Sequence, residues 1–224
     1  MCFSATASFG AGMALSAAGA VAMAKAKTPP QRVFASIPLL FAIQQISEGF
    51  VWMGLSNPAF KGGLQLATFT FLIFAQIVWT LWIPLAMLLL EQQERRKKII
   101  RGLLGAGVVL SIYHVWGLIV HPITGEALDC HIFYHVEYLR PYKMYSGFVY
   151  GVAAIIPCFV SSVKRMWWLG AAFLVSYVAT QIIYTIYIIS VWCFFAALLS
   201  TIVIFILNRM KTSQPGEVRK KSVL

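Results

Sequence analysis

Charged side chains are scarce in this sequence. Only 11% of the 224 residues are charged and only 7 are acidic, whereas a soluble domain carries about 25% charged residues. Hydrophobic residues make up 60% of the chain, and a chain of this length has too little interior to bury such a surplus in water. The composition excludes a soluble enzyme, a disordered tail and a disulfide-knotted secreted domain, and it indicates an integral membrane protein.

Several familiar motifs are also absent. The sequence has no phosphate-binding P-loop, no dinucleotide-binding glycine pattern and no Gly-x-Ser-x-Gly nucleophile elbow. No ten-residue stretch alternates with period two, so the pattern of a membrane β-barrel is missing. The last apolar stretch also lacks the lysine that a retinal Schiff base would need.

Seven stretches are apolar over the roughly 20 residues that a membrane helix requires. They cover residues 3–24, 33–55, 66–90, 99–120, 145–163, 166–186 and 187–207. The sequence predicts an all-α fold, a polytopic bundle of seven transmembrane helices within residues 1–208, followed by a basic tail over 209–224. No charge separates the last two stretches, so a single re-entrant hairpin there stays open as an alternative.

The basic residues alternate between the two sides of this bundle. All but three of the 18 Lys and Arg residues follow the first, third, fifth and seventh spans, and the three exceptions are Lys61, Arg140 and Lys143. Because Lys and Arg accumulate in cytoplasmic loops, we expect the N-terminus outside and the C-terminus in the cytoplasm. Topology thus accounts for the net charge of +11, and we expect membrane lipids, not nucleic acid, as partners.

The first predicted helix is rich in small residues, among them Gly10, Gly12 and Gly19. Small residues allow neighbouring helices to approach closely. We therefore expect this helix at the centre of the bundle.

Polar side chains gather in the outer halves of the predicted helices. Glu48 is the carboxylate placed well inside a span, and Gln44 lies one turn before it on the same face. An ionised Glu at this depth is costly, so we expect Glu48 to be protonated, paired or bound to a cation, and to face a polar cavity together with His131. The other polar residues of this layer are Cys2, Gln45, Tyr113, His114, His121, Gln181 and Trp192.

His131 and His135 are four residues apart, the spacing at which a helix presents two zinc ligands on one face. If the segment is helical, the pair holds zinc or another divalent metal together with Glu48, His114, His121 or Cys2, since zinc takes about four ligands from His, Cys and carboxylate. The alternative is an amphipathic segment at the membrane interface.

Two cysteines, Cys2 and Cys130, are expected on the outer side of the membrane. Disulfides are chemically allowed there, so the two residues form a bridge, share a metal ion or stay unpaired. We expect them close in space in the first two cases.

Three segments resemble an uncharacterised family of bacterial integral membrane proteins. They are the opening MCFSATASF, the segment QQISEG with Trp52, and the segment SVWCFFAA at 190–197. His131 and Tyr134 also match the family pattern. The resemblance spans nearly the whole chain and implies a multi-pass protein of the bacterial inner (plasma) membrane, without implying an activity.

A looser similarity links the chain to seven-helix membrane hydrolases of the alkaline ceramidase and adiponectin receptor type. It rests on the number of helices and on the intramembrane zinc site that histidines hold in those enzymes. They carry His-x-x-x-His on their last helix, whereas the last span predicted here contains no histidine.

Three functions stay open on the sequence alone. The first is a zinc-dependent hydrolase acting on a lipid or other apolar substrate, with Glu48 and Tyr134 as candidate catalytic residues and zinc activating a water molecule. The second is a non-catalytic membrane subunit or sensor that binds a partner or haem. The third is a small transporter in which Glu48 binds a cation or proton. Whether the protein is an enzyme, and its oligomeric state, stay open.

Overall fold

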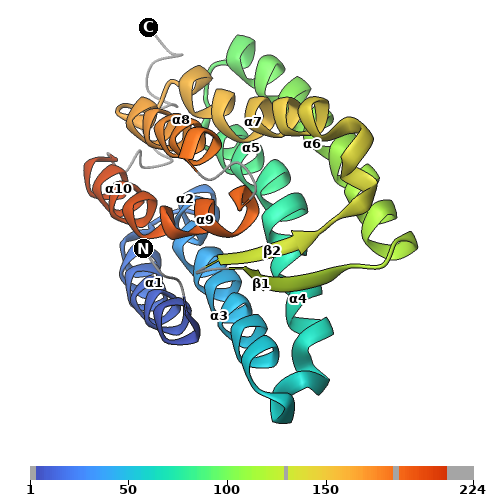
Figure 1. Cartoon of the computed structure of the whole chain (residues 1–224). Helices are drawn as coiled ribbons and strands as arrows, with labels where there is room; N and C mark the ends of the chain where they lie inside the picture. The colour runs from blue at the N-terminus through green and yellow to red at the C-terminus, as the bar shows by residue number, and fades with distance from the viewer. Residues whose placement is uncertain (1–3, 129–130, 184–186, 211–224) are drawn as a thin grey trace, which may run out of the picture.

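The structure is a computed structural model that describes residues 4–128, 131–183 and 187–210. Helices make up nearly all of these ranges, and a two-stranded hairpin is the β-structure among them (Figure 1). The predicted all-α class is confirmed apart from this hairpin. Most of the predicted tail, residues 211–224, lies outside the described residues. So do residues 184–186, where the sixth predicted span ends next to the seventh.

The first half of the chain forms three helical rods. Helix α1 spans Ala5–Lys25, and the second rod consists of α2 (Pro29–Ala35) and α3 (Ile37–Ser56). The third rod comprises the 3-10 turn η1 (Pro58–Gly63), α4 (Leu64–Ile73), the π-helical turn η2 (Phe74–Val78) and α5 (Trp79–Leu90).

The second half begins with the long helix α6 (Glu94–Val120). Strands β1 (Thr124–Leu128) and β2 (His131–His135) and the 3-10 turn η3 (Glu137–Tyr142) follow it. The chain ends with α7 (Lys143–Val160), α8 (Met166–Ile183), α9 (Ile188–Phe194) and α10 (Ala196–Arg209).

Among the described residues, five helical stretches are long and apolar enough to cross a membrane. They are Ala5–Lys25, Pro29–Ser56, Pro58–Leu90, Glu94–Val120 and Met166–Ile183. The predicted span 145–163 overlaps the shorter apolar helix Met144–Val160. The predicted span 187–207 is divided between α9 and α10, and only its second half overlaps the apolar helix Leu199–Arg209. The chain is a multi-pass membrane protein, and the count of seven crossings stays a prediction.

The helices follow one another around a closed ring. Helix α1 packs on α3, α3 on α4, α5 on α6, α6 on α7, α7 on α8, α8 on α10, and α10 returns to α1 (Figure 1). Large side chains inside the ring form the main core, among them Phe34, Phe41, Trp79, Met87 and Phe173.

Helix α1 lies in the wall of this ring. It contacts α2, α3 and α10, and only 28% of its apolar span is buried. The predicted close approach is confirmed, because a Cβ atom on Gly12 would lie 2.7 Å from the side chain of Ile46, and one on Gly19 would overlap Leu39. The predicted central position is wrong, since the small residues bring α1 close to one flanking helix, α3.

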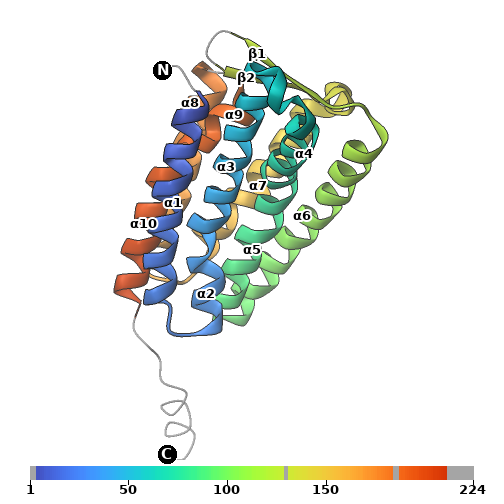
Figure 2. The same cartoon turned by 90° about the horizontal axis from the view of Figure 1, so that it is seen from below.

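The two ends of the bundle differ in charge. The hairpin, η1 and the start of α1 lie at one end, which we call the hairpin end (Figure 2). The α1–α2 and α5–α6 turns and the end of α10 lie at the opposite end, and the α7–α8 turn joins them there through hydrogen bonds to Glu91. We call this the basic end, since its turns and helix ends carry Lys25, Lys27, Arg95, Lys164 and Arg209.

The segment with the histidine pair is a β-hairpin. Strand β1 pairs antiparallel with β2, with Thr124 opposite His135. β-Branched and aromatic residues favour strands, and Ile132 and Tyr134 bury one face of β2 in a cluster with α3, α4 and α6. The helical interpretation is therefore wrong. Residues four apart in a strand are separated by about 13 Å, so His131 and His135 do not share one metal ion.

Candidate functional site

A cavity of about 140 Å³ lies inside the ring of helices. Its walls are mostly apolar and include six aromatic side chains: Phe41, Trp79, Tyr150, Phe173, Tyr177 and Trp192. Five polar side chains also line it: Gln44, Gln76, His114, Ser146 and Gln181. A largely apolar cavity with a few polar groups is the usual composition of a small-molecule site.

The π-helical turn η2 contributes Gln76 to this wall. Such turns are rare and occur frequently at functional sites. The Gln76 side chain is only 4% exposed, and its amide oxygen accepts a short hydrogen bond from the hydroxyl of Tyr138. Its amide nitrogen has no hydrogen-bond partner among the described residues.

A chain of hydrogen bonds leads to Gln76 from two other helices. The Tyr138 hydroxyl donates to Gln76 and lies 3.3 Å from Nδ1 of His114. Because the single hydroxyl proton is used by Gln76, Nδ1 of His114 donates to the Tyr138 oxygen. In the neutral imidazole, Nε2 then accepts from the Ser146 hydroxyl at 3.5 Å. The chain thus runs from Ser146 through His114 and Tyr138 to Gln76.

Tyr138 is held in place by its surroundings. The Tyr113 hydroxyl donates to the backbone oxygen of Tyr138 at 2.7 Å. Burial, followed by the neighbouring Tyr113, raises the pKa of the Tyr138 hydroxyl well above its usual range. The hydroxyl therefore stays protonated and remains a donor to Gln76.

Glu48 lies at a joint between α3 and α9 and is 1% exposed. Its Oε1 accepts from the Ser190 hydroxyl at 2.5 Å, and its Oε2 accepts from Nε2 of Gln45 at 3.3 Å. On the same helix, Gln44 accepts from the indole nitrogen of Trp79 at 2.7 Å. Buried polar bonds of this kind connect membrane helices, so the geometry of Glu48 fits the helix-linking role.

His131 lies near the same joint. Its ring stacks on Tyr187, with ring centroids 4.7 Å apart, and the Tyr187 backbone oxygen accepts from the Ser190 nitrogen at 3.0 Å. His131 and Glu48 therefore contact the two ends of one short segment, residues 187–190. A shared polar cavity for the two residues stays a prediction.

The other predicted metal ligands lie apart from this joint. His135 is exposed, with Nε2 3.1 Å from a carboxylate oxygen of Glu126. His121 follows the end of α6, with its ring 5.3 Å from that of Trp116. In the described parts of the chain, no three His, Cys, Asp or Glu residues group as metal ligands would. Cys2 and Cys130, with their predicted contact, lie outside the described residues.

Three further predicted residues have ordinary packing partners. Tyr134 stacks on Phe71, with centroids 4.9 Å apart. Gln181 donates to the Tyr177 hydroxyl at 3.2 Å, and Trp192 donates to the Ser176 hydroxyl at 2.8 Å.

Four residues of the polar layer predicted from the sequence line the cavity: Gln44, His114, Gln181 and Trp192. The sequence analysis did not single out the lining residues Gln76 and Ser146, or Tyr138, which bonds to Gln76. An amide in the middle of an apolar span, as at Gln76, is the signal that was available.

A family model matches residues 1–219 of the chain. The chain belongs to DUF6629, a family of unknown function. The match covers nearly the full length, as the predicted family resemblance did. No curated protein and no solved structure matches the chain.

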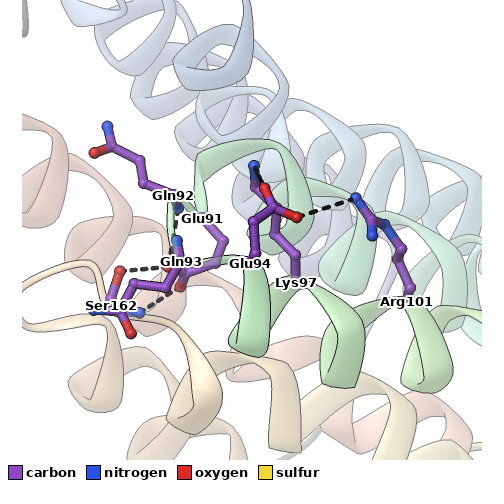
Figure 3. A network of polar contacts seen from close by, with 7 residues as sticks. All are labelled: Glu91, Gln92, Gln93, Glu94, Lys97, Arg101 and Ser162. Carbon is purple, nitrogen blue, oxygen red and sulfur yellow. Dashed lines mark hydrogen bonds and ion pairs between the residues drawn. The ribbon is translucent and has the colours of Figure 1, made fainter. Parts of the chain in front are cut away.

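This DUF6629 protein has a second buried carboxylate at its basic end, Glu91 (Figure 3). The backbone nitrogen and hydroxyl of Ser162 donate to its two oxygens at 2.6 and 2.5 Å. The backbone nitrogens of Gln92 and Gln93 each donate at 2.9 Å. Burial alone would raise the pKa of the Glu91 carboxyl, but these bonds, led by the Ser162 hydroxyl, hold it below its usual range.

Glu91 therefore connects the α5–α6 turn to the α7–α8 turn. Arg96 strengthens the same connection by donating to the Val160 backbone oxygen at the end of α7, at 2.7 Å. On the exposed side, Glu94 accepts from Lys97 at 2.7 Å and lies 4.0 Å from Arg101 (Figure 3). The network fixes the basic end of the ring and is separate from the cavity.

Proposed function

We propose that this DUF6629 protein is a non-catalytic membrane sensor or subunit that binds a small, uncharged, largely apolar molecule inside its ring of helices. The observation that supports this is the aromatic-lined cavity of about 140 Å³, with the Gln76 amide nitrogen in its wall and no partner for that nitrogen in the described parts of the chain. A cavity of about 150 Å³ is large enough to bind benzene. The ligand is therefore about the size of one substituted ring.

The chemistry of the wall favours an uncharged ligand. The polar residues that line the cavity are amides, a hydroxyl and an imidazole, and no Lys, Arg, Asp or Glu is among the described lining residues. A charged ligand buried there would lack an opposite charge, which makes its transfer from water unfavourable.

A zinc-dependent hydrolase is the second candidate, favoured by the shared contact of Glu48 and His131 with residues 187–190. The described residues fit a zinc site poorly, since both Glu48 oxygens already accept hydrogen bonds and His135 points to Glu126. Metal analysis of the purified protein tests this candidate. Stoichiometric zinc that falls in Glu48→Gln and His131→Ala would support the hydrolase over the sensor.

We also propose that the protein crosses the bacterial inner membrane seven times, with the basic end in the cytoplasm and the N-terminus outside. The support is the gathering of Lys and Arg at one end of the bundle, because such residues mark cytoplasmic loops.

Ligand binding is tested with cumene, a one-ring hydrocarbon, and the purified protein in detergent micelles. Isothermal titration calorimetry, with the heat of partition into empty micelles subtracted, should show saturable binding to the wild type. Ala154 lines the cavity and is 1% exposed, so Ala154→Leu should fill the cavity and weaken binding at least tenfold, about 1.4 kcal/mol. Leu199 of α10 also lines the cavity, so Leu199→Phe should reduce its volume and weaken binding as well.

The matched control is Val109→Leu, because Val109 is 70% exposed on the outside of α6. It should bind cumene as the wild type does. Equal, non-saturable uptake by all four proteins would refute the proposed ligand site.

A further inference from the structure

We infer that the ligand carries a hydrogen-bond-accepting oxygen of the carbonyl type, and that Gln76 selects for it by donating its amide N–H. This inference rests on the proposed ligand site and names the chemistry that the site distinguishes. Gln76 would then be the residue that distinguishes an aryl ketone or related carbonyl compound from a hydrocarbon of similar size.

The first argument is the unsatisfied donor. Buried polar atoms in folded proteins nearly always have a hydrogen-bond partner. Gln76 is 4% exposed and lines the cavity, yet its nitrogen has no partner among the described residues. A buried donor of this kind is destabilising until something accepts its hydrogen, and the cavity is the space beside it in which an acceptor fits.

The second argument is the orientation of the amide. The Tyr138 hydroxyl donates to the Gln76 oxygen, so the oxygen is occupied and the nitrogen is left for the cavity. The Tyr138 oxygen in turn accepts a hydrogen bond from Nδ1 of His114, and Nε2 of His114 accepts one from the Ser146 hydroxyl. Each member of this chain uses its donor on the next member, so the chain ends in a donor at Gln76. A ligand that meets this end must accept.

The third argument is the flat wall next to Gln76. Trp79 lies one helical turn after Gln76 and lines the same cavity. Its ring stacks on Phe41 with centroids 3.8 Å apart and an interplanar angle of 23°, and its indole nitrogen is fixed by Gln44. A planar ring packs against such an aromatic wall, and its oxygen substituent then faces Gln76.

The experiment compares acetophenone with cumene, in which a methyl group replaces the carbonyl oxygen. Titration calorimetry in micelles gives the ratio of the cumene to the acetophenone dissociation constant for each protein, and comparing this ratio between proteins cancels the different hydrophobicity of the two compounds. The ratio should be about 3- to 10-fold higher for the wild type than for Gln76→Leu, the net value of one neutral hydrogen bond, and Gln76→Leu should still bind cumene. Gln65→Leu, which changes an exposed glutamine of α4 on the same rod, should keep the wild-type ratio.

The outcomes separate the two proposals. If Gln76→Leu has the same ratio of dissociation constants as the wild type, the inference on Gln76 is wrong and the ligand site stands. A preference for phenol, which carries an O–H donor that acetophenone lacks, would overturn the inference by indicating that Gln76 presents its oxygen. If neither compound binds to the wild type or to Gln65→Leu, the proposed function itself fails.

Discussion

Glu48 and Ser190 should be energetically coupled, although 142 residues separate them in the sequence. The Ser190 hydroxyl donates to Glu48 at 2.5 Å, and both side chains are 1% exposed. The coupling is measured with the variants Glu48→Leu, Ser190→Ala and the double variant. A purely structural link between α3 and α9 predicts that the second substitution costs little once the first has been made.

The expected size follows from the environment of the bond. Hydrogen bonds between membrane helices have coupling free energies of about 0.6 kcal/mol on average and about 1.7 at most. The Glu48–Ser190 bond is short and shielded from solvent, so we expect about 1–1.5 kcal/mol, in the upper part of that range. Glu48→Leu alone should cost more, because it leaves Ser190 and Gln45 without an acceptor, at about 1–3 kcal/mol for each unpaired group.

The assay is unfolding in mixed micelles with increasing sodium dodecyl sulfate, followed by the helical circular dichroism signal. Ser47→Ala is the matched control, because Ser47 is buried on the same helix but donates only to the backbone oxygen of Ile43, at 2.8 Å. Its coupling to Glu48→Leu should be near zero. A Glu48–Ser190 coupling no larger than that of the Ser47 control would refute the helix-linking interpretation.

The remaining predictions concern packing, pH and topology. A Cβ atom on Gly107 would overlap the backbone oxygen of Thr80, so Gly107→Ala should destabilise the protein by about 1–3 kcal/mol. Gly105→Ala on the same helix meets open space and should stabilise by up to about 1 kcal/mol in the same unfolding assay, since alanine is the better helix former. Because hydrogen bonds lower the folded-state pKa of Glu91, its stabilisation should be complete above the unfolded pKa of about 4.3 and vanish as pH falls through the folded pKa. Glu91→Gln should lower stability at neutral pH and flatten this acid dependence, and an unchanged pH profile would contradict the role of Glu91. Reporter fusions at Leu224 should be active only in the cytoplasm; activity on the outer side alone would contradict the orientation.

Much of the fold follows from local composition. A bilayer dictates the length of its helices, and among the described residues five of the seven predicted spans overlap helical stretches of full length. The predicted span 145–163 overlaps a shorter helix, and 187–207 is divided between α9 and α10. The burial of Glu48 follows from the same argument, since a carboxylate in lipid needs a partner. The sequence alone does not identify Ser190 as the partner of Glu48, because the two residues meet only where α9 packs against α3.

The histidine pair shows where a sequence pattern is ambiguous. A separation of four residues brings side chains to the same face of a helix, because four is close to 3.6, and to the same face of a strand, because four is even. The spacing of the two histidines therefore does not distinguish a helix from a strand. The pairing of β2 with β1 shows that His131 and His135 lie in a strand.

The cavity and its polar chain were decided by tertiary structure alone. Gln76 and Tyr138 are 62 residues apart, and His114 and Ser146 are 32 residues apart. No local periodicity relates such positions. They meet because the ring closes: α6 packs both on the π-helical turn of the third rod and on α7, and Tyr138 of η3 bonds to Gln76. This closure also leaves the Gln76 nitrogen without a partner among the described residues. The sequence determined which side chains must avoid lipid, whereas the packing of the helices determined which of them face one another.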